Sequence, residues 1–134
     1  MSQENVEIAR EVLDAWNAED LERWLACWDA ACVWVPGMRG RMEGTQTYRG
    51  HEGLRRYWAE DAEVWERFFV EVHDVRTNGP EVVAITTGSA RGKHSEVETR
   101  ASMAFRFRVR NQKVIHGESY LEMEEALAAV GLSE

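Results

Sequence analysis

The stretch VETRASMAFRFRV, residues 97–109, decides the fold class of this chain. Ala101, Met103, Phe105 and Phe107 alternate in it with arginines and a serine, and this period of two is typical of a β-strand that buries one face. We expect the apolar face to meet the core. We expect the arginine face to be solvated or to pair across strands with acids such as Glu118.

Three further strands complete an antiparallel meander around this one. Their apolar residues follow the same two-residue period at residues 69–76, 82–91 and 114–121. Turn-forming residues stand between the strands, at positions 78–80 and 111–113. The C-terminal half of the chain therefore predicts a sheet of hairpin-connected strands.

The N-terminal half has the helical period of 3.6 instead. Apolar residues three or four positions apart predict a first helix at residues 3–18. A second helix carries Leu21, Trp24, Leu25 and Trp28, and a third starts near His51 and carries Leu54, Tyr57, Trp58, Ala62 and Trp65. Short extended pieces at 32–35 and 47–49 lie between them, and residues 124–130 form a last short helix. This order of elements predicts an α+β fold.

The composition fits one domain, residues 1–134, with 44% hydrophobic and 30% charged residues. The net charge of −8 would repel a polyanion, so we expect no nucleic-acid partner. No apolar run nears the roughly 20 residues of a membrane helix, and residues 1–7 do not resemble a signal peptide. We therefore expect no membrane partner and a cytoplasmic location, with Cys27 and Cys32 as free thiols in the core.

Three motifs stand at the junctions of these elements. They are AWNAEDL at residues 15–21, YRGHEGL at 48–54 and the closing hairpin at Lys113-Val114. In this order they resemble the nuclear-transport-factor-two-like superfamily, and YLEMEEAL at 120–127 is similar to its SnoaL-like branch. The resemblance covers almost the whole chain. It implies a cone-shaped, curved antiparallel or mixed sheet, three helices of the N-terminal half on its concave face, and a short C-terminal helix.

The resemblance also places the catalytic positions of known branches on this sequence. Ketosteroid isomerases have an Asp base just before the Pro that follows the first strand, where this chain has Val35. Their oxyanion hole uses a Tyr and an Asp, at positions held here by Val12 and Met103. These side chains neither take up a proton nor donate a hydrogen bond, so we expect no ketosteroid-type isomerisation. The acid and the histidine of the cyclase branch fall at Ser119 and Phe105, so that pattern is unmatched as well.

The sequence predicts neither a metal nor a cofactor. Its four histidines fall on four separate elements and form neither a His-Glu-x-x-His motif nor a facial triad. The chain also has no glycine-rich phosphate loop.

Asp61 is the one anomaly of the third helix. It follows Trp58 by three residues and precedes Trp65 by four, which places a carboxylate inside the apolar stripe. Burial there would raise its pKa and suit it to proton transfer, so Asp61 is the catalytic candidate. The alternative is that Asp61 lies at the mouth of a pocket or pairs with Arg39 or Arg41.

An apolar pocket is expected inside the cone. Small residues on the core faces of two strands would lie opposite large aromatic ones and leave a space; they are Ala84, Thr86, Gly88, Ala90, Gly117 and Ser119. The residues expected to line it and contact a ligand are Val12, Trp16, Trp34, Val35, Tyr57, Trp58, Met103, Phe105 and Ser119. The alternative is that Trp16, Trp34 and Trp58 fill the space themselves.

Several functions stay open at this point. The chain either transforms an apolar small molecule by cofactor-independent lyase, isomerase or cyclase chemistry, or binds such a molecule without catalysis. A dimeric scaffold with a filled pocket is the third possibility. Relatives in the superfamily usually pair through the outer face of the sheet, so we also expect a homodimer that uses Val83 and Ile85 there.

Overall fold

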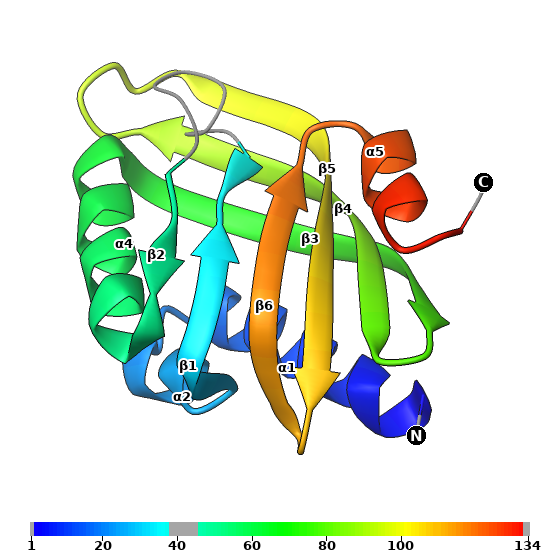
Figure 1. Ribbon diagram of the computed structural model, residues 1–134. Helices are drawn as coiled ribbons and strands as arrows, with labels where there is room; N and C mark the ends of the chain where they lie inside the picture. The colour runs from blue at the N-terminus through cyan, green and yellow to red at the C-terminus, as the bar shows by residue number, and fades with distance from the viewer. Residues whose placement is uncertain (1, 38–45, 133–134) are drawn as a thin grey trace.

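The structure is a computed structural model that describes residues 2–37 and 46–132. The elements run in the order α1 (Ser2–Asn17), α2 (Leu21–Leu25), β1 (Trp28–Val35), β2 (Tyr48–Arg49), α4 (Gly50–Val64), β3 (Trp65–Asn78), β4 (Glu81–Gly92), β5 (Glu98–Arg110), β6 (Lys113–Tyr120) and α5 (Met123–Ala129) (Figure 1).

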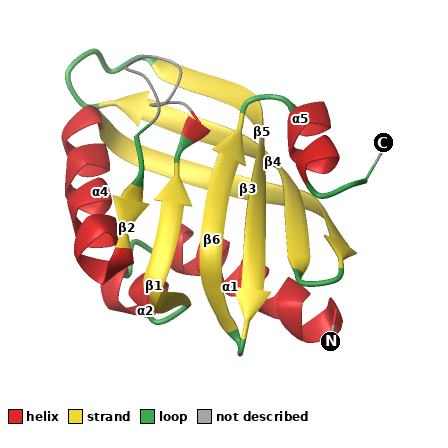
Figure 2. Cartoon of the chain, viewed as in Figure 1, coloured by secondary structure: helices red, strands yellow, loops and turns green. Residues whose placement is uncertain are grey.

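One six-stranded sheet, with strand order β2-β1-β6-β5-β4-β3, forms the body of the molecule (Figure 2). Strand β1 pairs with β6 in parallel and every other neighbouring pair is antiparallel, so the sheet is mixed. Helices α1, α2 and α4 lie on the concave face of the curved sheet, and α5 packs on the opposite face (Figure 1). The α+β cone fold predicted from the sequence is confirmed.

The alternation in β4 and β5 separates two buried layers. Ala84 pairs with Phe105, and both face the large core between the sheet and the three N-terminal-half helices. Val83 and Ala104 face the other way and are covered by α5, in a small cluster with Leu127. The central strands are therefore buried on both faces at this level, which explains why Ala104 interrupts the polar face of β5.

Two side chains at the end of α1 fix that helix to β3. The indole Nε1 of Trp16 donates a hydrogen bond to the carbonyl of Phe68 at 2.9 Å. The amide of Asn17 donates to the carbonyl of Val70 at 2.7 Å and accepts from the N–H of Val70 at 2.8 Å. The side chain of Asn17 therefore satisfies both the N–H and the carbonyl of Val70. This holds the end of α1 against β3, the edge strand of the sheet.

The structure corrects the predicted boundaries at two tryptophans. Trp28 begins β1 rather than ending the second helix, and Trp65 begins β3 rather than ending the third. Asp20 caps α2 by accepting from the N–H of Arg23, as a capping position predicts, but α2 ends at Leu25. Trp28 and Trp65 follow the preceding apolar residues at helical spacing, so periodicity alone cannot tell an inward helical position from an inward strand position.

The structure also corrects the expectation that Val83 lies on an open outer face. Its side chain is fully buried beneath α5, where Leu127 and Val130 cover it. Ile85, two residues along the same face, is only partly buried. The short C-terminal helix therefore takes up part of the surface that a partner was expected to cover.

Within residues 2–37 and 46–132, no helix is long and apolar enough to cross a membrane.

Candidate functional site

A cavity of about 60 Å³ lies between the three N-terminal-half helices and the concave face of the sheet. Its walls come from α1, α2, α4 and four strands. The lining residues are Val12, Leu13, Trp16, Trp24, Trp28, Trp34, Pro36, Tyr57, Asp61, Trp65, Phe68, Val70, Met103, Phe105, Phe107 and Ser119.

Aromatic rings fill most of the cone. The rings of Trp16, Trp24 and Trp58 form a triangle with centroids 5.0, 5.2 and 5.6 Å apart. From Trp24 the contacts continue through Trp28, at 5.7 Å, to Trp34, at 5.8 Å. These rings are tilted or edge-to-face to one another, an arrangement that aromatic quadrupoles favour. The tryptophans therefore build the walls and leave a small residual space.

The size of this space limits what it can hold. A buried site needs on the order of 10–15 Å³ for each water molecule, and a cavity of roughly 150 Å³ in a protein core accepts benzene. At about 60 Å³ the cavity holds a few waters or a compact molecule of few heavy atoms. A polycyclic ligand would require the tryptophan rings to move.

Asp61 brings a carboxylate to this apolar space. It lies on α4, is only 9% exposed and borders the cavity together with Trp16 and Trp65. It also borders an outer cleft between the ends of α1 and α4 and the start of β3. Asp61 therefore stands where the cavity meets that cleft. The arginines considered as its partners, Arg39 and Arg41, lie outside the described residues.

Seven of the nine residues expected around the pocket line the cavity together with Asp61: Val12, Trp16, Trp34, Tyr57, Met103, Phe105 and Ser119. Trp58 belongs to the surrounding ring cluster and faces the outer cleft rather than this space. Val35 follows Trp34 in β1 and so points to the other side of the strand. The prediction of Val35 as a wall residue was wrong, because in a strand the residue next to an inward-facing one points outward.

Several wall residues escaped the sequence analysis. The helical spacing of Trp24 and Trp28 gives no link to the pocket, and the strand predicted at residues 69–76 begins one residue after Phe68. Phe107 had a usable signal, because it shares the inward register of Met103 and Phe105. Extending that alternation by two residues would have included it.

The polar groups of the wall are few. Ser119 accepts a hydrogen bond from the N–H of Gly37 at 2.7 Å, so its hydroxyl oxygen ties the end of β1 to β6. The indole N–H groups of Trp28 and Trp34 are buried and have no hydrogen-bond partner within the described parts of the chain. Asp61 is thus the wall's one carboxylate among the described lining residues, and none of those is Lys, Arg or His.

These groups limit the chemistry that the cavity supports. Val12 and Met103 line it as apolar side chains, so the oxyanion donors of an isomerase are missing at the positions that the resemblance indicates. One buried carboxylate beside apolar walls can bind a cation or move a proton. Among the described residues, no group of three His, Cys, Asp or Glu side chains could hold a metal ion.

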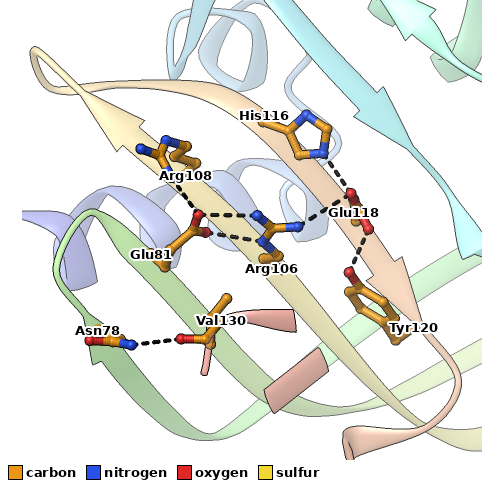
Figure 3. Close-up of polar contacts among 8 residues, drawn as sticks. All are labelled: Asn78, Glu81, Arg106, Arg108, His116, Glu118, Tyr120 and Val130. Atoms are coloured by element: carbon orange, nitrogen blue, oxygen red, sulfur yellow. Dashed lines mark hydrogen bonds and ion pairs between the residues drawn. The ribbon is translucent and has the colours of Figure 1, made fainter. Parts of the chain in front are cut away.

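A polar network lies on the opposite face of the sheet (Figure 3). Arg106 donates to both carboxylate oxygens of Glu81, at 3.0 and 3.1 Å, and Arg108 donates to one of them at 2.9 Å. Burial would raise the pKa of Glu81, but the bonds from Arg106 and Arg108 outweigh it and hold that pKa below its ordinary value. The expected pairing of the arginine face with acids is confirmed.

Glu118 extends this network across β6 (Figure 3). It accepts hydrogen bonds from Tyr120 and Arg106, and His116 Nε2 lies 2.7 Å from its Oε1. Burial and the bond to Glu118 raise the pKa of Tyr120 to about 12. The network joins β4, β5 and β6 on the face away from the cavity, so its role here is to hold the sheet.

Solved structures with the same fold include an NTF2-like protein of unknown function from Burkholderia pseudomallei. It is 16% identical, with 96% of this chain and 98% of that chain covered and a TM-score of 0.81. A protein with a ketosteroid isomerase-like fold from Catenulispora acidiphila, solved with trimethylamine, is 19% identical (94% and 93% covered, TM-score 0.76). A candidate SnoaL-like polyketide cyclase from a Jannaschia species is 18% identical (98% and 94% covered, TM-score 0.77).

These similarities establish the fold class, an NTF2-like cone. The sequence identifies the family within this fold class, because the model of the SnoaL-like domain family matches residues 9–117. The chain belongs to the SnoaL-like domain family. No curated protein is similar enough in sequence to match it.

Proposed function

We propose that this protein binds a compact, apolar small molecule in the cavity and that Asp61 transfers a proton to or from it, without a cofactor. The observation that carries the proposal is a carboxylate, 9% exposed, in the wall of a cavity that is otherwise aromatic and aliphatic. A carboxylate in the wall of an apolar cavity can serve as a general acid or base toward a molecule bound there.

The comparisons support a ligand of this kind. The Catenulispora protein of the same fold was solved with trimethylamine, a molecule of the size that a 60 Å³ cavity favours. The candidate polyketide cyclase among the fold neighbours supports the catalytic form of the proposal. Without proton transfer at Asp61, the same cavity makes the protein a binder of small molecules.

The binding step is tested by NMR titration with tert-butanol, a compact and mostly apolar compound. Five of the six tryptophans line the cavity, so their indole N–H signals report on it. We expect a saturable shift of the signals of Trp28 and Trp34. Val12→Phe, which fills the cavity, should abolish the shift, whereas Val64→Phe, the same substitution at an exposed position, should preserve it. A non-saturable response, or equal binding by Val12→Phe, would contradict the proposal.

The catalytic step is tested with Asp61→Asn, once native mass spectrometry of the purified protein has identified a bound molecule. We expect this variant to lose turnover and to keep its affinity for a neutral ligand, the pattern of a group that acts in the transition state. Glu63→Gln, an exposed acid of the same helix, is the matched control. Normal turnover by Asp61→Asn would show that Asp61 is not the catalytic group, and the absence of turnover in the wild type would make the protein a binder.

We also propose that the protein is a cytoplasmic homodimer that pairs through the outer face of the sheet. Ile85, partly buried next to α5, and exposed Phe69 on β3 support this, because both leave apolar surface on that face. Analytical ultracentrifugation at micromolar concentration should find a dimer, and Phe69→Glu should shift it toward monomer. A wild-type monomer would contradict the pairing and leave the cavity proposal intact.

A further inference from the structure

Four residues border both the cavity and the outer cleft: Trp16, Asp61, Trp65 and Phe68. The cleft has a volume of about 290 Å³, against about 60 Å³ for the cavity. These four residues, the partition, therefore separate a small space from a much larger one. How firmly each of them is held determines whether the cavity can extend into the cleft.

Three members of the partition are built into the core. The indole N–H of Trp16 donates to the carbonyl of Phe68 at 2.9 Å, and its ring packs on those of Trp24 and Trp58, with centroids 5.6 and 5.0 Å away. The ring of Phe68 lies against Trp16, 6.4 Å between centroids, and its backbone pairs with β4. Asp61 belongs to α4 and is only 9% exposed. Moving any of these three would disturb the packing around it.

The fourth member, Trp65, has a fixed backbone at the junction of α4 and β3. Its N–H donates to the carbonyl of Asp61 as the helix ends. The carbonyl of Val64, one residue earlier, accepts from the N–H of Lys93 at 3.0 Å, and the Lys93 ammonium donates to the carbonyl of Ala62 at 3.3 Å. The chain at this junction is therefore held without help from the indole of Trp65.

The side chain of Trp65 is the least restrained member of the partition. Within the described chain, its indole N–H has no hydrogen-bond partner, and the only aromatic ring it contacts is that of Phe68, with centroids 5.9 Å apart. Gly92, which pairs with it on β4, has no side chain to pack on it. Trp65 is also partly exposed. The partition is therefore opened at the smallest cost to the core by removing this one indole.

We propose that Trp65 determines the size of the molecule that the site accepts, by closing the cavity toward the outer cleft. This inference rests on the proposed function and assigns its size limit to one side chain. With the indole in place, the ligand has about 60 Å³; without it, the cavity and the cleft join into one larger space. Aromatic side chains line both spaces, so the joined site takes a compact group that carries an apolar chain.

Calorimetric titration with two tertiary alcohols tests this assignment. 2-Methyl-2-hexanol has the same head as tert-butanol and three more methylene groups. We expect the wild type to bind the longer alcohol no more tightly than tert-butanol, because the partition excludes its chain. Trp65→Ala should bind the longer alcohol at least about tenfold more tightly than the wild type does, since each buried methylene contributes about fourfold in affinity. Val64→Ala, at the exposed neighbouring position, is the matched control and should bind both alcohols as the wild type does.

The outcomes separate this inference from the proposed function. A wild type that prefers the longer alcohol has no size limit at the partition and would overturn the inference without any variant. A smaller gain in Trp65→Ala, with tert-butanol still bound by the wild type, would overturn the part assigned to Trp65 and leave small-molecule binding in place. Binding of neither alcohol by the wild type would overturn the proposed function as well. Trp65→Leu, which keeps more apolar volume, should show the same gain and replaces Trp65→Ala if that variant does not fold.

Discussion

Replacing Gly117 by Ala tests whether the tryptophan rings are as tightly packed as the structure indicates. An added Cβ would lie 2.7 Å from Cη2 of Trp28 and 3.1 Å from Cε3 of Trp34. The ring of Trp28 cannot withdraw easily, because it also contacts Trp24 and Phe107, with centroids 5.7 and 6.1 Å away. Overpacking of this kind costs about 1–3 kcal/mol. The lower entropy of the unfolded alanine chain offsets about 0.4–1 kcal/mol of it.

The matched control is Gly88→Ala in β4. There the added Cβ would lie 2.6 Å from Sδ of Met103, the far end of a flexible side chain that can rotate away. We expect Gly117→Ala to lower the free energy of unfolding by about 1–2 kcal/mol and Gly88→Ala to change it by less than about 1 kcal/mol. Urea denaturation should show a midpoint lower by about 1 M for the first variant alone, with an unchanged slope. A Gly117→Ala variant as stable as Gly88→Ala would refute the rigid ring packing.

Three further results follow from the structure. Asn17→Ala should lower the free energy of unfolding by about 2–3 kcal/mol in urea denaturation, because two backbone groups of Val70 lose their partner; a loss under 0.5 kcal/mol would argue against this tie. The lowered pKa of Glu81 means that its stabilisation, present at neutral pH, is lost as the pH falls through that pKa. Glu81→Gln should therefore be less stable at pH 7 and flatten the acid limb of stability against pH, and an unchanged limb would contradict this. Burial raises the pKa of Cys27 and of Cys32 to about 11, so both thiols should resist a disulfide reagent at pH 8 until the chain unfolds, and rapid labelling of the native protein would show otherwise.

The sequence predicted the sheet well because its signal is local and strong. The alternation of Met103, Phe105 and Phe107 determined which face of β5 is inward, and the structure agrees. The small residues Ala84 and Thr86 were likewise placed on the inner face, where both are buried. A two-residue period leaves little choice of strand register, because a shift by one residue would turn all the apolar side chains of the strand to the other face.

The errors arose where a local pattern has two meanings. Trp28 and Trp65 continue a helical spacing, yet each is the first residue of a strand, because an inward-facing aromatic residue satisfies either period at a junction. The burial of Val83 depends on α5, which begins 40 positions further along the sequence and packs on the outer face. Contacts between distant segments of this kind leave no periodic trace in the strand itself.

The site was only partly visible in the sequence. Asp61 was singled out because it interrupts an apolar stripe, and the structure places it in the cavity wall. The size of the cavity had no counterpart in the sequence, because it depends on the angles between the rings of residues such as Trp16 and Tyr57, 34° in that pair. The small volume in turn restricts the ligand to a compact molecule.

A crystal structure under xenon pressure tests the central claim, that the cone keeps a space able to accept a small apolar guest. Xenon is compact and apolar and enters cavities of this kind in protein interiors. We predict one ordered xenon atom enclosed by Trp34, Phe105 and Asp61. A cone in which the tryptophan rings close this space and no xenon lies beside Asp61 would contradict the account.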